Sequence, residues 1–512
     1  MVLLGLLIPA CREIEEAPLL DRSASVDVAA VVAGGYLLRS EPWGEFVWVR
    51  ADEDGLVQVR TRVDGEVQAY QALSDGTVLL LTHGPNLLVR LDPSAGVLNE
   101  VPLDSAYDAL VISDDELLAV THFSAVAAGG ADDIFFTPTG MMVHDLADGA
   151  DAVTVQLTGG RPRAVSFTPP FRVPGVDREL RMLMVTAERE LTLVDWQAPN
   201  PLDRQRRVFL AAPDSGARLN VSGILFTGSD DAVDPDVPRF FVRTAESSDL
   251  FVIDLVASET GSERELQPSI NQIALGIRPQ VLERFVVDGR QKLFAMSSSQ
   301  ASLTIVDVQT NGTTRVNLPR AMSGALLWPT LEHAGERWEA LLFANGFDRL
   351  FFLDLERAES EGEAALRSVS ATAPVSGLRF ADEAPHQRAL ALFSNGGGVS
   401  VVDLSRRVAV PFQSSRTLSS VALEGDTLFA AVEGRGAVEA LNLGTLGRAG
   451  LDSGRVVRRL LVAPGSTHLL IVHAGQGGRF SLVDTARFEA DHMIRLDGLV
   501  LEGVLDNAGR QP

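Results

Sequence analysis

The sequence is poor in positive charge. It contains 44 basic residues against 68 acidic ones, which gives a formal net charge of -24 at pH 7. A field of this sign repels phosphate backbones and anionic lipid headgroups, so we expect no nucleic-acid partner. The basic residues are almost all arginine, because Lys292 is the only lysine. This bias is typical of a GC-rich genome, although arginine also suits bidentate recognition of anions better than lysine does.

The sequence also lacks the common motifs of catalysis and cofactor binding. It has no Gly-x-Ser-x-Gly elbow, no phosphate-binding glycine loop, no His-Glu-x-x-His and no Cys-x-x-Cys-His for haem attachment. These absences exclude the commonest signatures of hydrolases, nucleotide-binding proteins and c-type cytochromes. They do not exclude an enzyme whose catalytic residues come singly from different parts of the fold. We expect no bound cofactor.

Cysteine occurs once, as Cys11, so no disulfide can form within the chain. The apolar residues 1–10 (MVLLGLLIPA) are too few for a membrane-spanning helix of about 20 residues, and they are typical of a signal peptide. Residues 8–11 (IPAC) resemble a bacterial lipobox, whose cysteine becomes the acylated N-terminus. The segment differs from that pattern because no basic residue precedes Cys11. The alternative is an ordinary buried hydrophobic N-terminus.

These features predict three parts of the chain: a signal peptide at residues 1–11, a polar tether at 12–27 and a folded body at 28–512. The tether residues are polar and interrupted by proline. We therefore expect a monomer in the periplasm or on the cell surface, attached to the bacterial membrane only through a lipid on Cys11.

Sustained helical periodicity is missing from the folded body, which instead repeats one strand-rich unit. In each unit a short apolar run, a turn and an alternating segment end in an acidic or amide residue, here called the marker residue. The nine markers stand on average 49 residues apart, within the roughly 40 to 50 residues of a four-stranded propeller blade. They are Asp92, Asp145, Asp195, Asp254, Asp307, Asp354, Asp403, Asn442 and Asp484.

The repeat predicts an all-β fold, a single large β-propeller of four-stranded antiparallel blades. Radial stacking buries both faces of such sheets, which no lone sheet can do. We expect eight or nine blades, within a range of seven to ten. Residues 46–61 are either a tenth, partial unit or a segment that pairs with residues 499–505 to close the ring. The core should include Ile305, Val306, Phe351, Phe352, Val401 and Val402.

The unit resembles the YVTN-type β-propeller repeat of secreted bacterial proteins. Residues 293–312 (LFAMSSSQASLTIVDVQTNG) match its apolar strand, polar turn and alternating strand, and residues 157–162 and 275–279 match its Gly-x-x-Pro element. The resemblance covers about residues 75–490. Several units lack Gly-x-x-Pro, and none carries the tetrapeptide itself. The resemblance implies the fold and leaves function open, because propellers of this type include surface proteins, haem-handling enzymes and lactone hydrolases.

Two groups of aspartates have a structural and a functional interpretation. Asp230, Asp231, Asp234 and Asp236 in residues 227–237 are oxygen ligands dense enough for calcium, but their spacing is not that of an EF-hand, and the sequence favours a solvated acidic loop. The marker aspartates follow strands, where such a side chain accepts hydrogen bonds from the backbone two residues on. We therefore interpret the markers as structural.

With the strands of a blade named a to d, the d–a and b–c loops emerge on one face and the markers on the other. An arginine precedes the a strand of six units, and a histidine ends the b strand of three, so we predict a ligand-binding face with an anion-binding collar. The alternative is that each arginine pairs with an acidic residue of an adjoining blade. The insertion at residues 123–140 would leave the same face as a lid or supply counterions. The residues are Arg161, Arg218, Arg278, Arg320, Arg416, Arg455, His83, His122 and His473.

The three histidines would occupy adjoining blades unless the segment at 46–61 intervenes. We do not expect them to share a metal, because equivalent b strands lie about 10 Å or more apart, against Zn–N bonds of about 2.1 Å.

The sequence thus favours a non-catalytic binding or scaffold lipoprotein that recognises a protein, peptide or glycan partner through one propeller face. The alternative function is a periplasmic propeller enzyme, either a lactone hydrolase or a cofactor-dependent oxidoreductase domain.

Overall fold

A computed structural model gives the structure of the chain. It describes residues 24–32, 34–40, 45–52, 55–124, 139–147, 152–158, 160–187, 190–198, 200, 204–210, 219–228, 238–260, 263–330, 337–381, 386–463, 466–474, 479–496 and 499–501. Cys11 and the predicted signal peptide lie outside these residues. The predicted tether lies outside them up to residue 23, and the first strand begins at Ala24.

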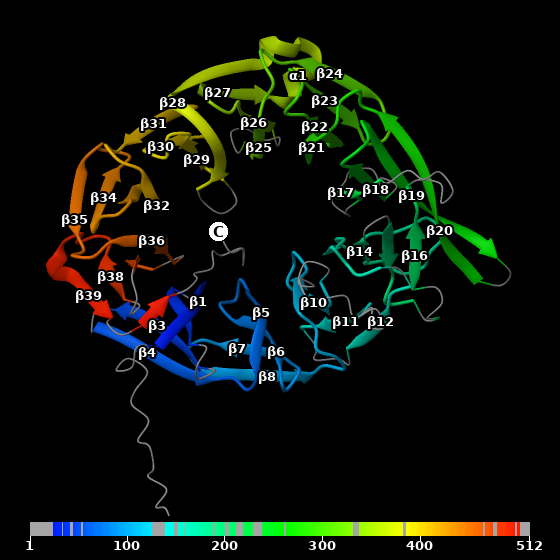
Figure 1. The fold of residues 1–512 in the computed structure, drawn as a ribbon. Coiled ribbons are helices and arrows are strands. Elements are labelled where there is room, and N and C mark those ends of the chain that lie inside the picture. Colours follow the sequence, from blue (N-terminus) through cyan, green and yellow to red (C-terminus); the bar gives the residue numbers. More distant parts are fainter. Residues whose placement is uncertain are drawn as a thin grey trace, which may run out of the picture.

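The described chain is a β-propeller, whose sheets stand in sequence order around a central axis (Figure 1). It has nine sheets, seven of them four-stranded, one five-stranded and one seven-stranded. The seven-stranded sheet contains two four-strand units that share β28, because this strand pairs first with β27 and then with β29. The nine sheets match the upper end of the expected eight or nine, and they hold ten four-strand units, which is one more than expected but within the range of seven to ten.

Each unit is an antiparallel meander in which strand a is innermost and strand d is outermost. The first five units are β1 (Ala24–Val32), β2 (Gly35–Ser40), β3 (Glu45–Asp52) and β4 (Gly55–Arg62); β5 (Glu66–Ala72), β6 (Val78–His83), β7 (Leu87–Asp92) and β8 (Gly96–Pro102); β9 (Ala109–Ile112), β10 (Leu118–His122), β11 (Gly140–Asp145) and β12 (Val153–Gln156); β13 (Ala164–Phe167), β14 (Leu183–Thr186), β15 (Leu191–Val194) and β16 (Gln205–Val208); and β17 (Val221–Thr227), β18 (Arg239–Thr244), β19 (Asp249–Thr260) and β20 (Glu263–Ala274).

The last five units follow the same order. They are β21 (Val281–Val287), β22 (Arg290–Met296), β23 (Ser302–Asp307) and β24 (Thr313–Asn317); β25 (Gly324–Thr330), β26 (Arg337–Phe343), β27 (Phe347–Asp354) and the first half of β28 (Leu366–Phe380); its second half with β29 (Arg388–Phe393), β30 (Gly398–Asp403) and β31 (Val408–Gln413); β32 (Leu418–Glu424), β33 (Thr427–Val432), β34 (Ala437–Asn442) and β35 (Arg448–Asp452); and β36 (Val457–Val462), β37 (His468–His473), β38 (Phe480–Asp484) and β39 (Met493–Leu496). The helical elements are α1 (Leu355–Glu361), η4 (Gly362–Ala365) and η5 (Ala490–His492), and β40 (Leu499–Leu501) ends the described chain.

The b and c strands are buried on both sides because each lies between two neighbouring blades. Four residues in a row are fully buried in β14 (LMVT) and in β15 (LTLV). The outermost β8 (GVLNEVP) is mostly exposed instead. Continuous apolar runs are the expected composition of strands covered on both faces. The six predicted core residues Ile305, Val306, Phe351, Phe352, Val401 and Val402 are all buried, as predicted.

The ring closes between the first and the last unit. Val47 and Val49 of β3 share one apolar cluster with Leu470 of β37 and Leu482 of β38. The hydroxyl of Tyr36 joins the same two units, since it donates to the carbonyls of Leu461 and His468 and accepts from the backbone N–H of Ala463. Burial of this hydroxyl raises the pKa of Tyr36 above its ordinary value.

Residues 46–61 belong to β3 and β4 of a complete first unit, and β40 pairs in parallel with β1 of that unit. The segment thus belongs to a tenth unit, and the predicted pairing of residues 46–61 with the C-terminal segment was wrong, because β1 makes that contact. The idea of a partial unit was wrong, because β1 and β2 complete its sheet.

The marker residues are structural, as predicted for strand-end aspartates. In seven units the marker side chain accepts a hydrogen bond from a backbone N–H two or three residues on, namely from Ser94, Ala147, Gln309, Arg357, Arg406, Gly444 and Ala486. Hydrogen bonds from Ser94 lower the pKa of Asp92, as expected for a carboxylate held in its charged form. The other two markers, Asp195 and Asp254, form ion pairs with Arg178 and Arg239.

Candidate ligand-binding face

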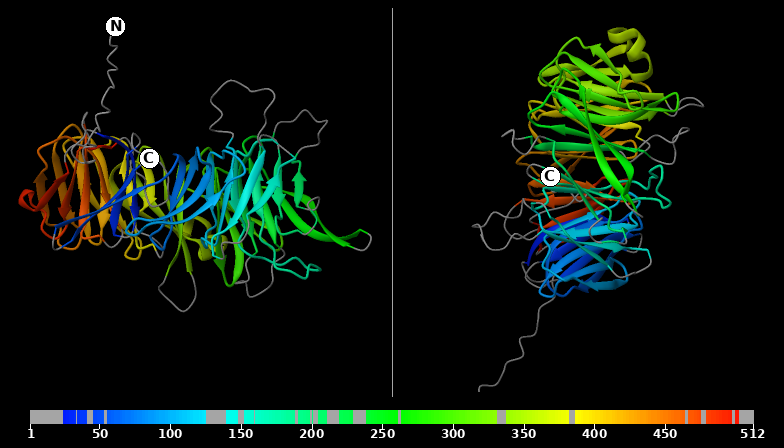
Figure 2. Two further views of the ribbon diagram at one scale, coloured as in Figure 1. Left: turned by 90° about the horizontal axis from the view of Figure 1, so that it is seen from below. Right: turned by 90° about the vertical axis from the view of Figure 1, so that its right-hand side faces the viewer.

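The ring has two unlike faces, which Figure 2 shows edge-on. The marker face consists of the a–b and c–d turns with the marker residues. The collar face consists of the d–a and b–c loops. Arg161, Arg278, Arg320, Arg416 and Arg455 all lie in d–a loops, where the sequence placed them, whereas Arg218 lies outside the described residues.

The entry from a d–a loop into its a strand has a recurring geometry. Three a strands have a β-bulge near their first residue: β17, the second half of β28, and β32. In each of them the extra residue is a serine. The hydroxyls of Ser222, Ser376 and Ser419 donate to the b-strand carbonyls of Arg243, Leu392 and Ala431. Sequence analysis missed this device, although the Val-Ser-Gly triplets at residues 221–223 and 375–377 were a visible signal. Bulges are typical of strand ends, where they re-aim side chains.

The loop at residues 275–280 shows what the Gly-x-x-Pro element does. Arg243 of the neighbouring β18 donates to the carbonyl of Gln280 at 2.7 Å, and Gln300 donates to the carbonyl of Gly276 at 3.3 Å. Arg278 in this loop donates to the carbonyl of Glu246 at 3.3 Å. Hydrogen bonds from Asn220 lower the pKa of Glu246, and the positive charge of Arg278 lowers it further. Arg278 therefore matches the blade-to-blade alternative more closely than the other collar arginines do.

The remaining collar arginines differ in their surroundings. The guanidinium carbon of Arg320 lies 3.5 Å from the centroid of the Phe347 ring. The guanidinium groups of Arg161, Arg320 and Arg416 make no hydrogen bond or ion pair with the residues that the structure describes. Arg455 has further polar contacts in the structure. Three collar arginines thus keep donors that the described residues do not use.

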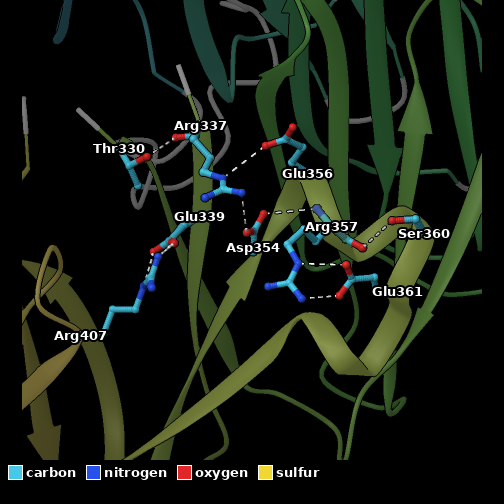
Figure 3. A network of polar contacts seen from close by, with 9 residues as sticks. All are labelled: Thr330, Arg337, Glu339, Asp354, Glu356, Arg357, Ser360, Glu361 and Arg407. Atoms are coloured by element: carbon cyan, nitrogen blue, oxygen red, sulfur yellow. Dashed lines mark hydrogen bonds and ion pairs between the residues drawn. The ribbon is translucent and has the colours of Figure 1, made fainter. Parts of the chain in front are cut away.

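On the marker face, in contrast, many basic residues pair with carboxylates, although Arg172, Arg290 and Arg487 form no such pair with the described residues. Figure 3 shows Arg337 between Asp354 and Glu356, and Arg407 facing Glu339 of the preceding blade. Lys292, the only lysine, pairs with Glu359 of α1. On the collar face, Arg207 pairs with Glu190. Further marker-face pairs are Arg178–Asp195, Arg181–Asp115, Arg239–Asp254 and Arg388–Asp426.

The three predicted histidines end b strands on the collar face, but they do not form one cluster. The Nε2 of His83 lies 2.7 Å from the carbonyl oxygen of Tyr107 in the next unit. Burial lowers the pKa of His122, and the Nε2 of His473 lies 2.9 Å from the Ser481 hydroxyl. The first unit separates His473 from His83, so the three do not occupy adjoining blades.

Other sequence candidates are not placed by the structure. Asp230, Asp231, Asp234 and Asp236 lie outside the described residues, as does most of the insertion at 123–140. Within the described part of the chain, no group of three or more histidine, cysteine, aspartate or glutamate residues is arranged to hold a metal ion. None of the helices found there is long and apolar enough to cross a membrane.

Comparison with known proteins adds no family. No protein-family model and no curated protein matches the sequence. Solved structures with similarity include dihydro-heme d1 dehydrogenase NirN in complex with DHE (14% identity, 76% of this chain and 74% of that chain, TM-score 0.41). They also include the eukaryotic initiation factor (9%, 88% and 95%, 0.45) and apo AztD from Citrobacter koseri (11%, 71% and 90%, 0.31). At these values the likenesses say nothing about function, and the architecture stands on the strand order and packing described above.

Proposed function

We propose that this protein is a non-catalytic β-propeller of the bacterial envelope that binds a protein, peptide or glycan partner. Its collar face would bind acidic groups of that partner. The observation that carries the proposal is the contrast between the two faces. Many basic residues of the marker face are paired with carboxylates, although Arg172, Arg290 and Arg487 have no such pair among the described residues. On the collar face, Arg161, Arg320 and Arg416 extend from equivalent loops with donors that the described residues leave unused. In a chain of net charge -24, an anionic group gains the most favourable binding free energy next to such arginines.

The position of the first strand supports an anchor on the same side. β1 is an a strand, so the chain enters the ring from the collar face at Ala24. An extended stretch of 13 residues from Cys11 to Ala24 reaches at most roughly 45 Å. A lipid on Cys11 would therefore keep the point of entry on the collar face within roughly 45 Å of the membrane.

The collar is tested with a hexaglutamate peptide as probe and hexaglutamine as the uncharged control. Titration calorimetry at 0.15 M salt should show binding of hexaglutamate, and the affinity should fall as salt rises. The variants Arg161→Ala, Arg320→Ala and Arg416→Ala should each weaken it about tenfold, because a hydrogen bond to a charged group contributes about 1.5 to 3 kcal/mol. The triple variant should abolish binding.

Arg406→Ala is the matched control, because Arg406 lies on the marker face with its side chain 81% exposed. Thermal unfolding of every variant separates loss of binding from loss of structure. If the native protein does not bind hexaglutamate, or if Arg406→Ala weakens binding as much as the collar variants do, the collar face is not the binding face.

The anchor is tested by Cys11→Ser in a bacterial host. One acyl chain holds a protein only marginally, since each buried methylene contributes about 0.8 kcal/mol, so a triacylated cysteine is needed for stable attachment. The native protein should sediment with membranes, and Cys11→Ser should move to the soluble fraction. An unchanged distribution would refute lipid attachment and leave the collar proposal intact.

A further inference from the structure

We propose that Arg320 is the residue that sets the specificity of the collar face, and that it binds a carboxylate of an acidic peptide. This inference rests on the binding function proposed above. It is carried by the way in which Phe347 and its surroundings hold the Arg320 guanidinium, an arrangement that Arg161, Arg278 and Arg416 do not have within the described residues.

Arg320 lies against an aromatic ring that has a second ring beside it. Its guanidinium lies over the ring of Phe347, which is stacked on Phe351 with a centroid distance of 6.3 Å and an interplanar angle of 6°. Phe351 is buried in the apolar cluster between the sixth and seventh units. A guanidinium over a ring face leaves its N–H groups directed outward in its own plane. The ring contact therefore restricts the orientation of the Arg320 donors before any ligand arrives.

The loop of Arg320 is fastened to the turn that carries Phe347. The backbone N–H of Asn345 donates to the Ser323 hydroxyl at 2.8 Å, and the N–H of Ser323 donates to the carbonyl of Phe343 at 2.7 Å. Gly346 next to Asn345 has a φ of 73°, which a residue with a side chain adopts only at a cost. The d–a loop and the b–c turn are thus joined, and the backbone of the exposed Asn345 lies next to the Arg320 loop.

The donor set fits a carboxylate. The in-plane N–H pair of a guanidinium matches the two oxygens of a carboxylate in a bidentate contact, which a lysine ammonium cannot reproduce. The one positive charge of Arg320 balances a single negative charge. A phosphate dianion would call for a second cation at the same place.

The experiment compares arginine-to-lysine variants, which keep the positive charge. Arg320→Lys should weaken hexaglutamate binding about tenfold, because it loses both the bidentate contact and the ring contact. Arg416 lies in the equivalent loop of another blade and has no ring contact among the described residues, so Arg416→Lys should weaken binding about twofold. Phe347→Leu should weaken it about fivefold with Arg320 intact, and Arg406→Lys on the marker face should leave it unchanged. Inorganic phosphate is titrated as the alternative anion.

The outcomes separate this inference from the proposed function. Equal losses for Arg320→Lys and Arg416→Lys would overturn the role of Arg320 while the binding face stands. Binding of phosphate without hexaglutamate would overturn the carboxylate assignment. Failure of both probes with the native protein would overturn the binding function itself. A larger loss for Arg320→Lys and Phe347→Leu in folded variants supports the inference.

Discussion

Replacement of Arg407 by alanine is expected to lower the free energy of unfolding by about 3 to 5 kcal/mol, because it strands a buried carboxylate. The side chain of Glu339 on β26 is only 2% exposed, and its ion-pair partner Arg407 belongs to the turn between β30 and β31 of the next blade. The Nε of Arg407 donates to the second carboxylate oxygen at 3.2 Å. Removing the arginine leaves a charge between two blades without its partner.

Chemical denaturation of Arg407→Ala against Arg406→Ala measures this cost with a neighbouring arginine as control. Arg406 is 81% exposed, so its pair with Asp403 should contribute only about 0 to 1 kcal/mol. The double variant Glu339→Gln with Arg407→Ala should recover part of the loss, since the buried charge is then gone. Equal effects of Arg406→Ala and Arg407→Ala would contradict the assignment of this pair as a blade-to-blade contact.

Stability should fall on acidification below pH 6.5, and His144 should account for about 3 kcal/mol of the fall. His144 on β11 is 3% exposed, and burial lowers its pKa to about 4, while the charge of Asp104 opposes the shift. In the unfolded chain the pKa of histidine is about 6.5. The unfolded state therefore binds the proton first as pH falls. The contribution is fully present above pH 6.5 and is lost progressively down to about pH 4.

The variant His144→Leu isolates the contribution of His144 to the free energy of unfolding. Unfolding free energies of the native protein and of His144→Leu are measured at half-unit steps from pH 7.5 to pH 4.5, and the difference between the two curves removes all other titrations. The difference should decrease as pH falls, because the variant has no proton to take up at this position. A constant difference would show that His144 is not held neutral in the fold.

The sequence predicted the propeller because its b and c strands are covered on both sides. Their continuous apolar runs, each ended by a marker such as Asp307 or Asp403, form a pattern that survives the variation of the loops. The a and d strands carry a weaker signal, since a strands lie beside the axis and d strands beside solvent. The first unit was read as partial, although Asp52 ends β3 just 40 residues before Asp92, in the marker position.

Other parts of the fold were out of reach of sequence patterns. β28 serves two blades as one strand, with Thr372 at a φ of 75° between its two halves, and no composition marks that change of partner. The collar arginines could be placed because each precedes an a strand at a similar spacing. Their partners could not, because Phe347 beneath Arg320 comes from another strand, and such contacts depend on three-dimensional packing.

Hydrogen–deuterium exchange with and without hexaglutamate tests the central claim most directly, because it maps binding onto the two faces in one experiment. The account predicts slower exchange in the loops that carry Arg161, Arg320 and Arg416, strongest at residues 318–323, with no change in the turns after the marker residues. Protection confined to the marker-face turns, or spread evenly over both faces, would contradict it.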